Sequence, residues 1–325
     1  MRTADLTPED ERYLAIAEEH RDNVMKIPML SSFRVVALFA YEDLDGNHKH
    51  IIGGNCECAN IGAALCAERS AICQMQFLPV KHVRKVYIVS DAEVCLTPGT
   101  LCREFLSSSP FFTPQTPFIS RATKCKPCVT TLQELFPFPS VYSHVRRPDV
   151  LTFGHAFCAK AVGSNETPNN DDVTPFMQAQ TKSMTSLEQE AYLAAVRATE
   201  KDHRDDLFPL RYAAAVVFSN GSVRVAWQHK TLEYGSSLDA ISKLITFIED
   251  EMTKDASVRP TLIVQVDQFG ILHAPSARAR AYLYEYNFND VELLVHDDAA
   301  TLHRVTAGNL VFESPDCIAT TTGCS

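Results

Sequence analysis

The chain repeats one arrangement of apolar strands and helices, and this repeat limits the folds that it can adopt. In each copy an apolar strand ends at a turn and is followed by a second strand, a helix, a buried strand, a further helix and a closing strand. A unit of this order predicts a three-layer α/β/α sandwich, in which helices cover a mixed sheet. The matching segments are residues 32–39 and 211–218, 71–72 and 240–241, 86–89 and 262–264, 98–106 and 275–283, and 129–130 and 305–306.

Length and polarity divide the chain into domains. Its 325 residues suffice for two domains of ordinary size, each with a core of its own. Residues 164–172 are polar and nearly free of large apolar side chains, which is typical of a linker. We therefore predict two tandem α/β sandwiches with mixed sheets, at residues 1–155 and 186–325, joined by a linker at 156–185.

Cys66 and Glu68 are the most informative pair of side chains in the first copy. A thiolate and a carboxylate two residues apart can build a hydrolytic zinc site, in which the thiolate binds the metal and the carboxylate moves protons. Within one helix, Glu68 would lie about 200° around the axis from Cys66. Both can face one pocket only if Cys66 stands at the helix N-terminus, where the helix dipole also stabilises a thiolate.

The run from residue 53 to residue 72 resembles the signature of the cytidine deaminase family, and the resemblance extends over residues 32–137. It implies the two-domain form of the family with a degenerate C-terminal copy, zinc as cofactor, homodimers, and hydrolysis of cytidine or deoxycytidine in pyrimidine salvage. The implied site residues are Glu68 as catalytic proton shuttle, Cys66 and Cys102 as zinc ligands, Arg69 as the arginine that offsets their charge, Asn55 and Glu57 at the ribose 3′-hydroxyl, Phe33 beside the base, and Ala67 with its backbone at the pyrimidine.

Gly99 departs from the family pattern, because it stands where the family carries a further zinc-binding cysteine. Three outcomes remain open. Cys95, four residues upstream, completes the site; or zinc is held by the two remaining cysteines and water; or no catalytic metal is bound. Cys125 and Cys128 form a Cys-x-x-Cys pair, a spacing that suits a metal, but we expect them on a late strand away from the zinc, as reduced thiols.

The repeat also predicts what the second copy contributes. Its residues at the ligand positions offer no thiolate or carboxylate, so we expect the C-terminal domain to have a structural role. The predicted correspondences are Cys66 with Gly235, Glu68 with Ser237, Gly99 with Ser276, and Cys102 with Ala279.

Charge and cysteine content narrow the partners and the compartment. A net charge of −10 disfavours capture of RNA or DNA, which needs a basic surface, and favours a small nucleoside substrate. No apolar run is long enough for a membrane span. The eleven irregularly spaced cysteines, and an N-terminus without the apolar core of a signal peptide, indicate reduced thiols and a cytoplasmic protein. At this end Thr7 is expected to cap a helix that begins with Pro8.

Zinc-dependent deamination of cytidine or deoxycytidine is the function that these residues favour. The alternative is a catalytically impaired relative that binds nucleosides or serves assembly, because Gly99 replaces a ligand. An editing deaminase that acts on RNA or DNA is a third hypothesis. Structural roles also remain open for four of the implied site residues. Asn55 and Glu57 could belong to a turn and a strand edge, Arg69 to a surface ion pair, and Phe33 to the core.

Overall fold

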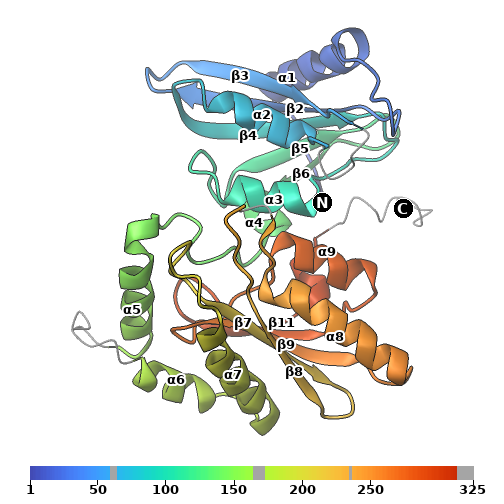
Figure 1. The fold of residues 1–325 in the computed structure, drawn as a ribbon. Helices are drawn as coiled ribbons and strands as arrows, with labels where there is room; N and C mark the ends of the chain where they lie inside the picture. Colours follow the sequence, from blue (N-terminus) through green and yellow to red (C-terminus); the bar gives the residue numbers. More distant parts are fainter. Residues whose placement is uncertain (59–63, 164–172, 234–235, 313–325) are drawn as a thin grey trace. The chain divides into compact units, whose positions relative to one another are not determined.

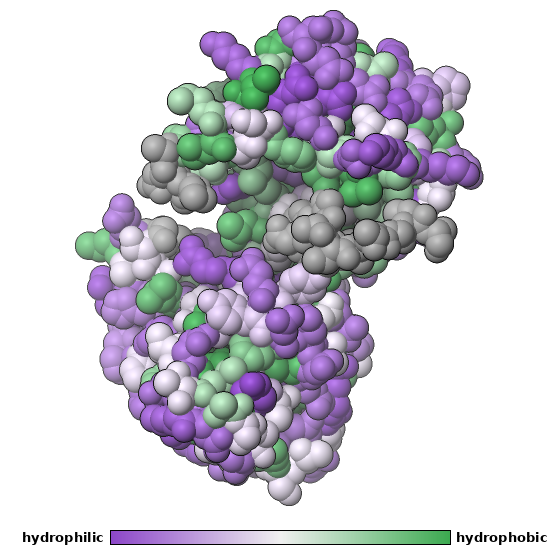
Figure 2. All heavy atoms as spheres, turned by 90° about the vertical axis from the view of Figure 1, so that its right-hand side faces the viewer, coloured by the Kyte–Doolittle hydropathy of each residue, from purple (hydrophilic) through white to green (hydrophobic). Residues whose placement is uncertain are grey.

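The computed structural model describes residues 1–58, 64–163, 173–233 and 236–312. The contacts divide the chain into two compact units, Met1–Pro137 with the segment that starts at Phe312, and Phe138–Val311 (Figure 1). The surface seen in Figure 2 is mainly hydrophilic on both units, with apolar residues scattered among polar ones. Among the described residues, no helix is long and apolar enough to cross a membrane.

The first unit is built on a mixed sheet. Its elements are β1 (Arg2–Thr3), α1 (Pro8–Glu19), the short helix η1 (His20–Val24), β2 (Val35–Asp43), β3 (His48–Gly54), α2 (Ala67–Met75), β4 (Val80–Ser90), α3 (Thr100–Ser107), β5 (Pro117–Arg121), β6 (Cys128–Thr131) and α4 (Leu132–Leu135). The strand order is β1-β6-β5-β4-β2-β3; β4 and β5 are parallel, and the other neighbours are antiparallel.

Strand β2 shows why this sheet is covered on both faces. Its side chains are apolar in succession, so alternate residues point into two cores. Leu38 packs with α1 on one face, and Phe39 packs with α2, α3 and α4 on the other. Helix α1 begins as expected: the Thr7 side chain accepts a hydrogen bond from the Asp10 amide, and Pro8 is the first helical residue.

The second unit repeats this topology. Its elements are η3 (Arg147–Asp149), α5 (Val150–Ala161), α6 (Thr174–Thr181), α7 (Ser186–Ala198), η4 (Thr199–Lys201), β7 (Tyr212–Phe218), β8 (Val223–Trp227), α8 (Ala240–Lys254), β9 (Pro260–Asp267), α9 (Ala277–Glu285), β10 (Glu292–His296), β11 (Leu302–Thr306) and η6 (Ala307–Leu310). The strand order β11-β10-β9-β7-β8 matches β6-β5-β4-β2-β3, and α7 and α8 pack on opposite faces. The prediction of tandem α/β units with mixed sheets is confirmed.

Residues 156–185, which were predicted to be a linker, include residues of two helices. Residues 164–172 lie outside the described part of the chain, but α5 and α6 stand on either side of them. Phe157 and Phe176 from these helices are buried in a cluster with Ile271, so the helices belong to the second unit. That unit begins at Phe138, and not at residue 186, because helices absent from the first copy pack onto it.

The start of the second unit's helix α8 corrects two of the predicted correspondences. Cys66 is the N-cap of α2 and Asp239 is the N-cap of α8. Each follows a residue that forms an isolated bridge with a residue two positions after the preceding strand, Leu65 with Cys56 and Leu238 with His229. Cys66 therefore corresponds to Asp239, and Glu68 to Ile241 instead of Ser237. The predicted counterpart Gly235 lies outside the described residues.

The other two correspondences agree with the structure. Gly99 and Ser276 are the N-caps of α3 and α9, which places Cys102 opposite Ala279. Contrary to the prediction, the second copy therefore has a carboxylate at one of the positions, Asp239, and it has a hydroxyl at another, Ser276; both cap helices.

Candidate active site

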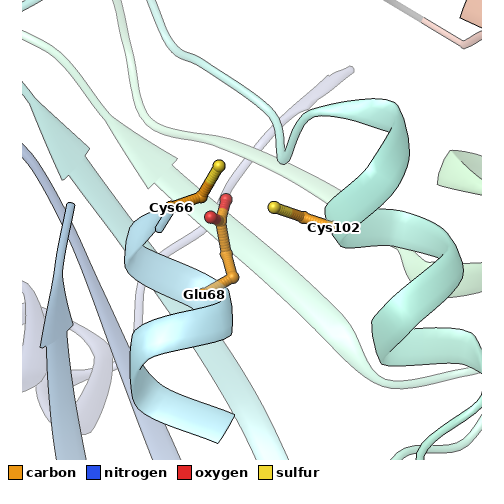
Figure 3. Close-up of side chains that lie close together, drawn as sticks. All are labelled: Cys66, Glu68 and Cys102. Atoms are coloured by element: carbon orange, nitrogen blue, oxygen red, sulfur yellow. The ribbon is translucent and has the colours of Figure 1, made fainter. Parts of the chain in front are cut away.

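Cys66, Glu68 and Cys102 come together in the first unit between the N-terminal ends of α2 and α3 (Figure 3). Their sulfur and carboxylate oxygen atoms all lie within 4.8 Å of one another. Cys66 is the N-cap of α2 and has an extended backbone (φ −70°, ψ 159°), so its side chain and that of Glu68 point toward the same place beside Cys102 (Figure 3). This is the arrangement that the two-residue spacing required.

A glycine in β3 sets the position of α2. A Cβ atom on Gly53 would collide with the carbonyl oxygen of Ala67 and the amide nitrogen of Ala71. The helix backbone therefore packs directly on the strand, which only glycine permits. Ala67 is the first residue of α2 and is buried, so the helix start that carries Cys66 and Glu68 is fixed against the sheet.

Glu68 is almost wholly buried, at 4% exposure. Burial is the largest influence on its carboxyl group and raises its pKa to about 7. A carboxyl group with this pKa can hold or release a proton near neutral pH, which is the property required of a general acid and base.

The two thiols differ in ionisation. The hydrogen bond with Cys102 is the largest cause that lowers the pKa of the Cys66 thiol, and the Arg69 guanidinium lowers it further, against the opposing effect of burial. The same hydrogen bond, together with burial, raises the pKa of Cys102. Arg69 Nη2 lies 3.4 Å from Cys66 Sγ and donates to the carbonyl of Ala64 at 3.1 Å. The site therefore favours a thiolate at Cys66.

Gly99 lies beside Cys102 and has no side-chain atom that could bind a metal. It is the N-cap of α3, with φ −62° and ψ 156°, an extended conformation that any residue adopts. Among the described residues, no atom lies within 4 Å of a Cβ atom placed at this position. The position therefore lacks a ligand but has the backbone and the space for a side chain.

Cys95, the candidate substitute ligand, does not join this group. Its side chain is buried and lies against the Ser120 carbonyl (3.2 Å) and the Cys125 sulfur (3.2 Å). Cys125 lies in the loop before β6, and Cys128 is the first residue of that strand. Among the described side chains, Cys66, Glu68 and Cys102 are the group of three that could hold a metal, and it contains none of these other cysteines.

The residues expected at the ribose hydrogen-bond to the segment that precedes β2. Asn55 donates to the carbonyl of Phe33 (2.9 Å) and accepts from the Val35 amide (2.8 Å). Glu57 accepts from the amide and the hydroxyl of Ser31, at 2.9 and 2.6 Å. Together these contacts fix the segment that carries Phe33, which is half-buried.

Arg103 is a residue that the sequence analysis did not identify. Its guanidinium is fully buried and donates to the carbonyls of Pro98, Leu135 and Phe312, so it holds the loop that leads to Gly99. The repeat contained the signal, because the equivalent arginine of the second unit, Arg280, is also buried and donates to the matching proline carbonyl.

Comparisons with known proteins give structural matches only. No protein-family model matches the chain, and no curated protein matches it. Among solved structures, the chain is similar to the cytidine deaminase from Burkholderia pseudomallei, with 22% identity over 41% of this chain and 99% of that one and a TM-score of 0.34. It is also similar to the cytidine deaminases from Mycobacterium leprae (17% identity, 40% and 100% covered, TM-score 0.32) and Mycobacterium tuberculosis (18% identity, 40% and 98% covered, TM-score 0.33).

Proposed function

We propose that the first unit is a zinc-dependent hydrolytic deaminase that converts cytidine or deoxycytidine and water to uridine or deoxyuridine and ammonia. The observation that carries this proposal is the convergence of two thiols on a buried carboxyl group, Cys66 and Cys102 on Glu68. The resemblance of residues 53–72 to the cytidine deaminase signature names the substrate class.

The donor set suits zinc, which prefers thiolate, imidazole and carboxylate ligands. Cys66 and Cys102 would hold the ion, with Arg69 beside the first thiolate to offset its charge. Bound zinc would supply the Lewis acidity that makes a water molecule a nucleophile near neutral pH. The proposed set leaves out Cys95, because its sulfur lies against that of Cys125.

Glu68 is proposed to move the protons of the reaction. In its ionised form it would accept a proton from the attacking water, and in its protonated form it would donate to the ring nitrogen and then to the leaving amine. A pKa of about 7 makes both forms available at neutral pH.

The binding side of the proposal assigns Asn55 and Glu57 to the ribose hydroxyl, Phe33 to the base, and the Ala67 backbone to the pyrimidine. Asn55 and Glu57 now hydrogen-bond to residues 31–35, so a bound ribose would share or replace these contacts. Homodimers and a cytoplasmic location remain part of the proposal.

Gly99 favours a second candidate function. A site without this ligand can keep the nucleoside pocket and lose turnover, which would leave a protein for nucleoside binding or assembly. Its conformation and open surroundings show that the fold does not require glycine there.

The deciding experiment is conversion of cytidine to uridine by the zinc-supplied protein, with Glu68→Ala beside it. We expect turnover in the wild type and its loss in the variant, because no other buried carboxyl group lies in the described metal-binding group. Glu190→Ala, on the exposed side of α7, is the matched control and should leave turnover unchanged. If the metal-replete wild-type protein shows no turnover at millimolar cytidine, the deaminase proposal is rejected and the nucleoside-binding or assembly function is favoured.

A further inference from the structure

Two loops of the first unit lie together beside the sheet, and each contributes a cysteine. Cys95 is in the loop after β4, and Cys125 is in the loop before β6. The amide of Lys124 donates to the carbonyl of Glu93 at 2.9 Å, and the two side chains form an ion pair. The loops are therefore held together immediately next to the two thiols.

Cys95 and Cys125 are in direct contact. Their sulfur atoms are 3.2 Å apart, and the Cys95 amide donates to the Cys125 sulfur at 3.1 Å. A disulfide has a sulfur–sulfur distance of about 2.05 Å, so the two atoms need to approach by only about 1.2 Å. On the other side of the pair, the Ser120 hydroxyl donates to the carbonyl of Leu96, which keeps the Cys95 loop against β5.

The two thiols differ in their access to solvent. Cys95 is buried, and burial raises the pKa of its thiol, whereas Cys125 is half-buried. An oxidant in solution therefore reaches Cys125 first. Cys128 begins β6, and its thiol donates to the carbonyl of Lys126 (3.3 Å) and also interacts with the Cys95 thiol, which makes Cys128 the competing partner for Cys95. The three sulfurs do not form a metal-binding group of the kind that the described residues form at Glu68.

We propose that Cys95 and Cys125 are a modification site at which a reversible disulfide forms. With a low-molecular-weight disulfide as oxidant, the Cys125 thiolate attacks one of its sulfur atoms, and one small thiol leaves. Cys95 loses its proton and attacks the Cys125 sulfur of the mixed disulfide, and the second small thiol leaves. Two protein thiols are oxidised and one small disulfide is reduced to two thiols; an excess of small thiol reverses both steps.

The disulfide would act on the segment that it encloses. Residues 95–125 contain α3 with Cys102, and Gly99 at the start of that helix. Closing this loop restricts the unfolded chain and ties the segment to the loop before β6. Oxidation should therefore raise the thermal midpoint of unfolding by several degrees. This inference does not depend on the proposed deaminase activity.

Disulfide mapping tests the proposal on the full-length protein. The protein is incubated with oxidised glutathione, alkylated and digested with trypsin without reductant. We expect a disulfide between the peptide of residues 86–103 and that of residues 125–146, and its loss after dithiothreitol. Each peptide carries a second cysteine, Cys102 and Cys128, so four variants are needed.

The linkage should be absent in Cys95→Ser and Cys125→Ser and present in Cys102→Ser and Cys128→Ser. Cys95→Ala repeats the first variant without a buried hydroxyl, and circular dichroism checks that each variant is folded. The thermal shift on oxidation should disappear in Cys125→Ser. A linkage that survives Cys95→Ser, one that requires Cys128, or thiols that stay reduced because they bind zinc would each overturn the proposal.

Discussion

At Gly99 the backbone is extended and the direction of a side chain is open, whereas the neighbouring positions of the site are tightly specified. Cys66 must be an N-cap to share a pocket with Glu68, and Cys102 is buried on the first turn of α3. The missing ligand is therefore a local property of one side chain, and the surrounding structure would accept its return.

Gly99→Cys should complete the metal site. A third thiolate placed beside Cys102 adds a ligand to an existing pair, so we expect zinc affinity to rise by at least about tenfold, with faster deamination. Metal retained after dialysis and initial rates with cytidine would measure the two effects. Gly99→Ala is the matched control, because it fills the same space without a donor. Equal zinc content in the two variants would contradict the expectation.

The sequence predicted part of this site and not the rest, for reasons that lie in individual residues. The N-cap position of Cys66 followed from helix geometry, since the two-residue spacing allowed one arrangement. The place of Cys95 could not be predicted, because separation along a loop does not give the direction of a side chain. Its sulfur turns toward β5, as only the contacts with Ser120 and Cys125 reveal.

At the scale of elements, the position of α2 on β3 determines whether the site exists. Gly53→Ala should displace α2, because its Cβ would meet helix backbone and not a flexible side chain. We expect a loss of about 1–3 kcal/mol in the free energy of unfolding, with loss of zinc binding. Urea unfolding and metal analysis would measure these. Gly54→Ala is the matched control, because the nearest described atoms to its Cβ belong to the movable Met25 side chain; an equal loss there would contradict this account.

Helix α1 is fixed to the opposite face of the sheet by Asp10. Burial raises the pKa of this carboxyl group, but hydrogen bonds from Lys85, Thr7 and Tyr87 outweigh it and lower the pKa to about 2. The ionised form is thus favoured in the folded state. Its stabilising effect is fully present above pH 4 and is lost as the pH falls toward 2.

Asp10→Asn should therefore lower the free energy of unfolding by about 1–3 kcal/mol at pH 7, since it removes charged hydrogen bonds. The difference from the wild type should shrink steadily between pH 4 and pH 2. Urea unfolding followed by circular dichroism at each pH would measure it. Asp45→Asn, at an exposed turn, should change little. A difference that is constant with pH would show that the charge of Asp10 is not the cause.

Elements were predicted best where the pattern of apolar residues was regular. Strands β2, β4, β7 and β9 were found, since burial on both faces gives continuous apolar runs such as that of β2. The predicted order omitted β5 and β10, which lie between the second helix of each unit and its closing strand. Helices α5 and α6 were missed because the polar stretch between them was taken to represent the whole segment. The shift in α8 had another cause: the matching Ala-Ile pairs occupy different turns of α2 and α8.

At the scale of the whole molecule, the duplicated units use equivalent positions differently. Glu57 follows Gly54, the last residue of β3, at the same interval as Lys230 follows Trp227, the last residue of β8. Glu57 is half-buried and contacts a loop, whereas Lys230 is buried and paired with Asp202 at 2.9 Å. The second unit therefore has an internal ion pair at the position where the first unit has its proposed substrate-binding residue.

Lys230→Met should destabilise the second unit by about 3–5 kcal/mol, because it leaves a buried carboxylate without its partner. Trp227 is the only tryptophan and lies in β8, where Lys201 and Lys243 stack on its ring, so its fluorescence reports unfolding of this unit. Urea unfolding followed at Trp227 would give the change.

The matched control is Lys254→Met. It removes the ion pairs of an exposed lysine with Asp250 and Glu251 and should cost less than about 1 kcal/mol, because Glu251 keeps its partner Arg224. Comparable losses in the two variants would show that the Asp202 pair is no more important than a surface contact.

The space around Gly99 also determines how easily mutation could restore the ligand. A glycine codon that ends in a pyrimidine becomes a cysteine codon by one base substitution, and no described atom lies within 4 Å of the place where the new Cβ would stand. A population that must grow on cytidine as its only pyrimidine source could therefore recover the ligand in a single mutational step. The absence of a metal ligand at position 99 would then be reversible by mutation, because the fold keeps room for the side chain.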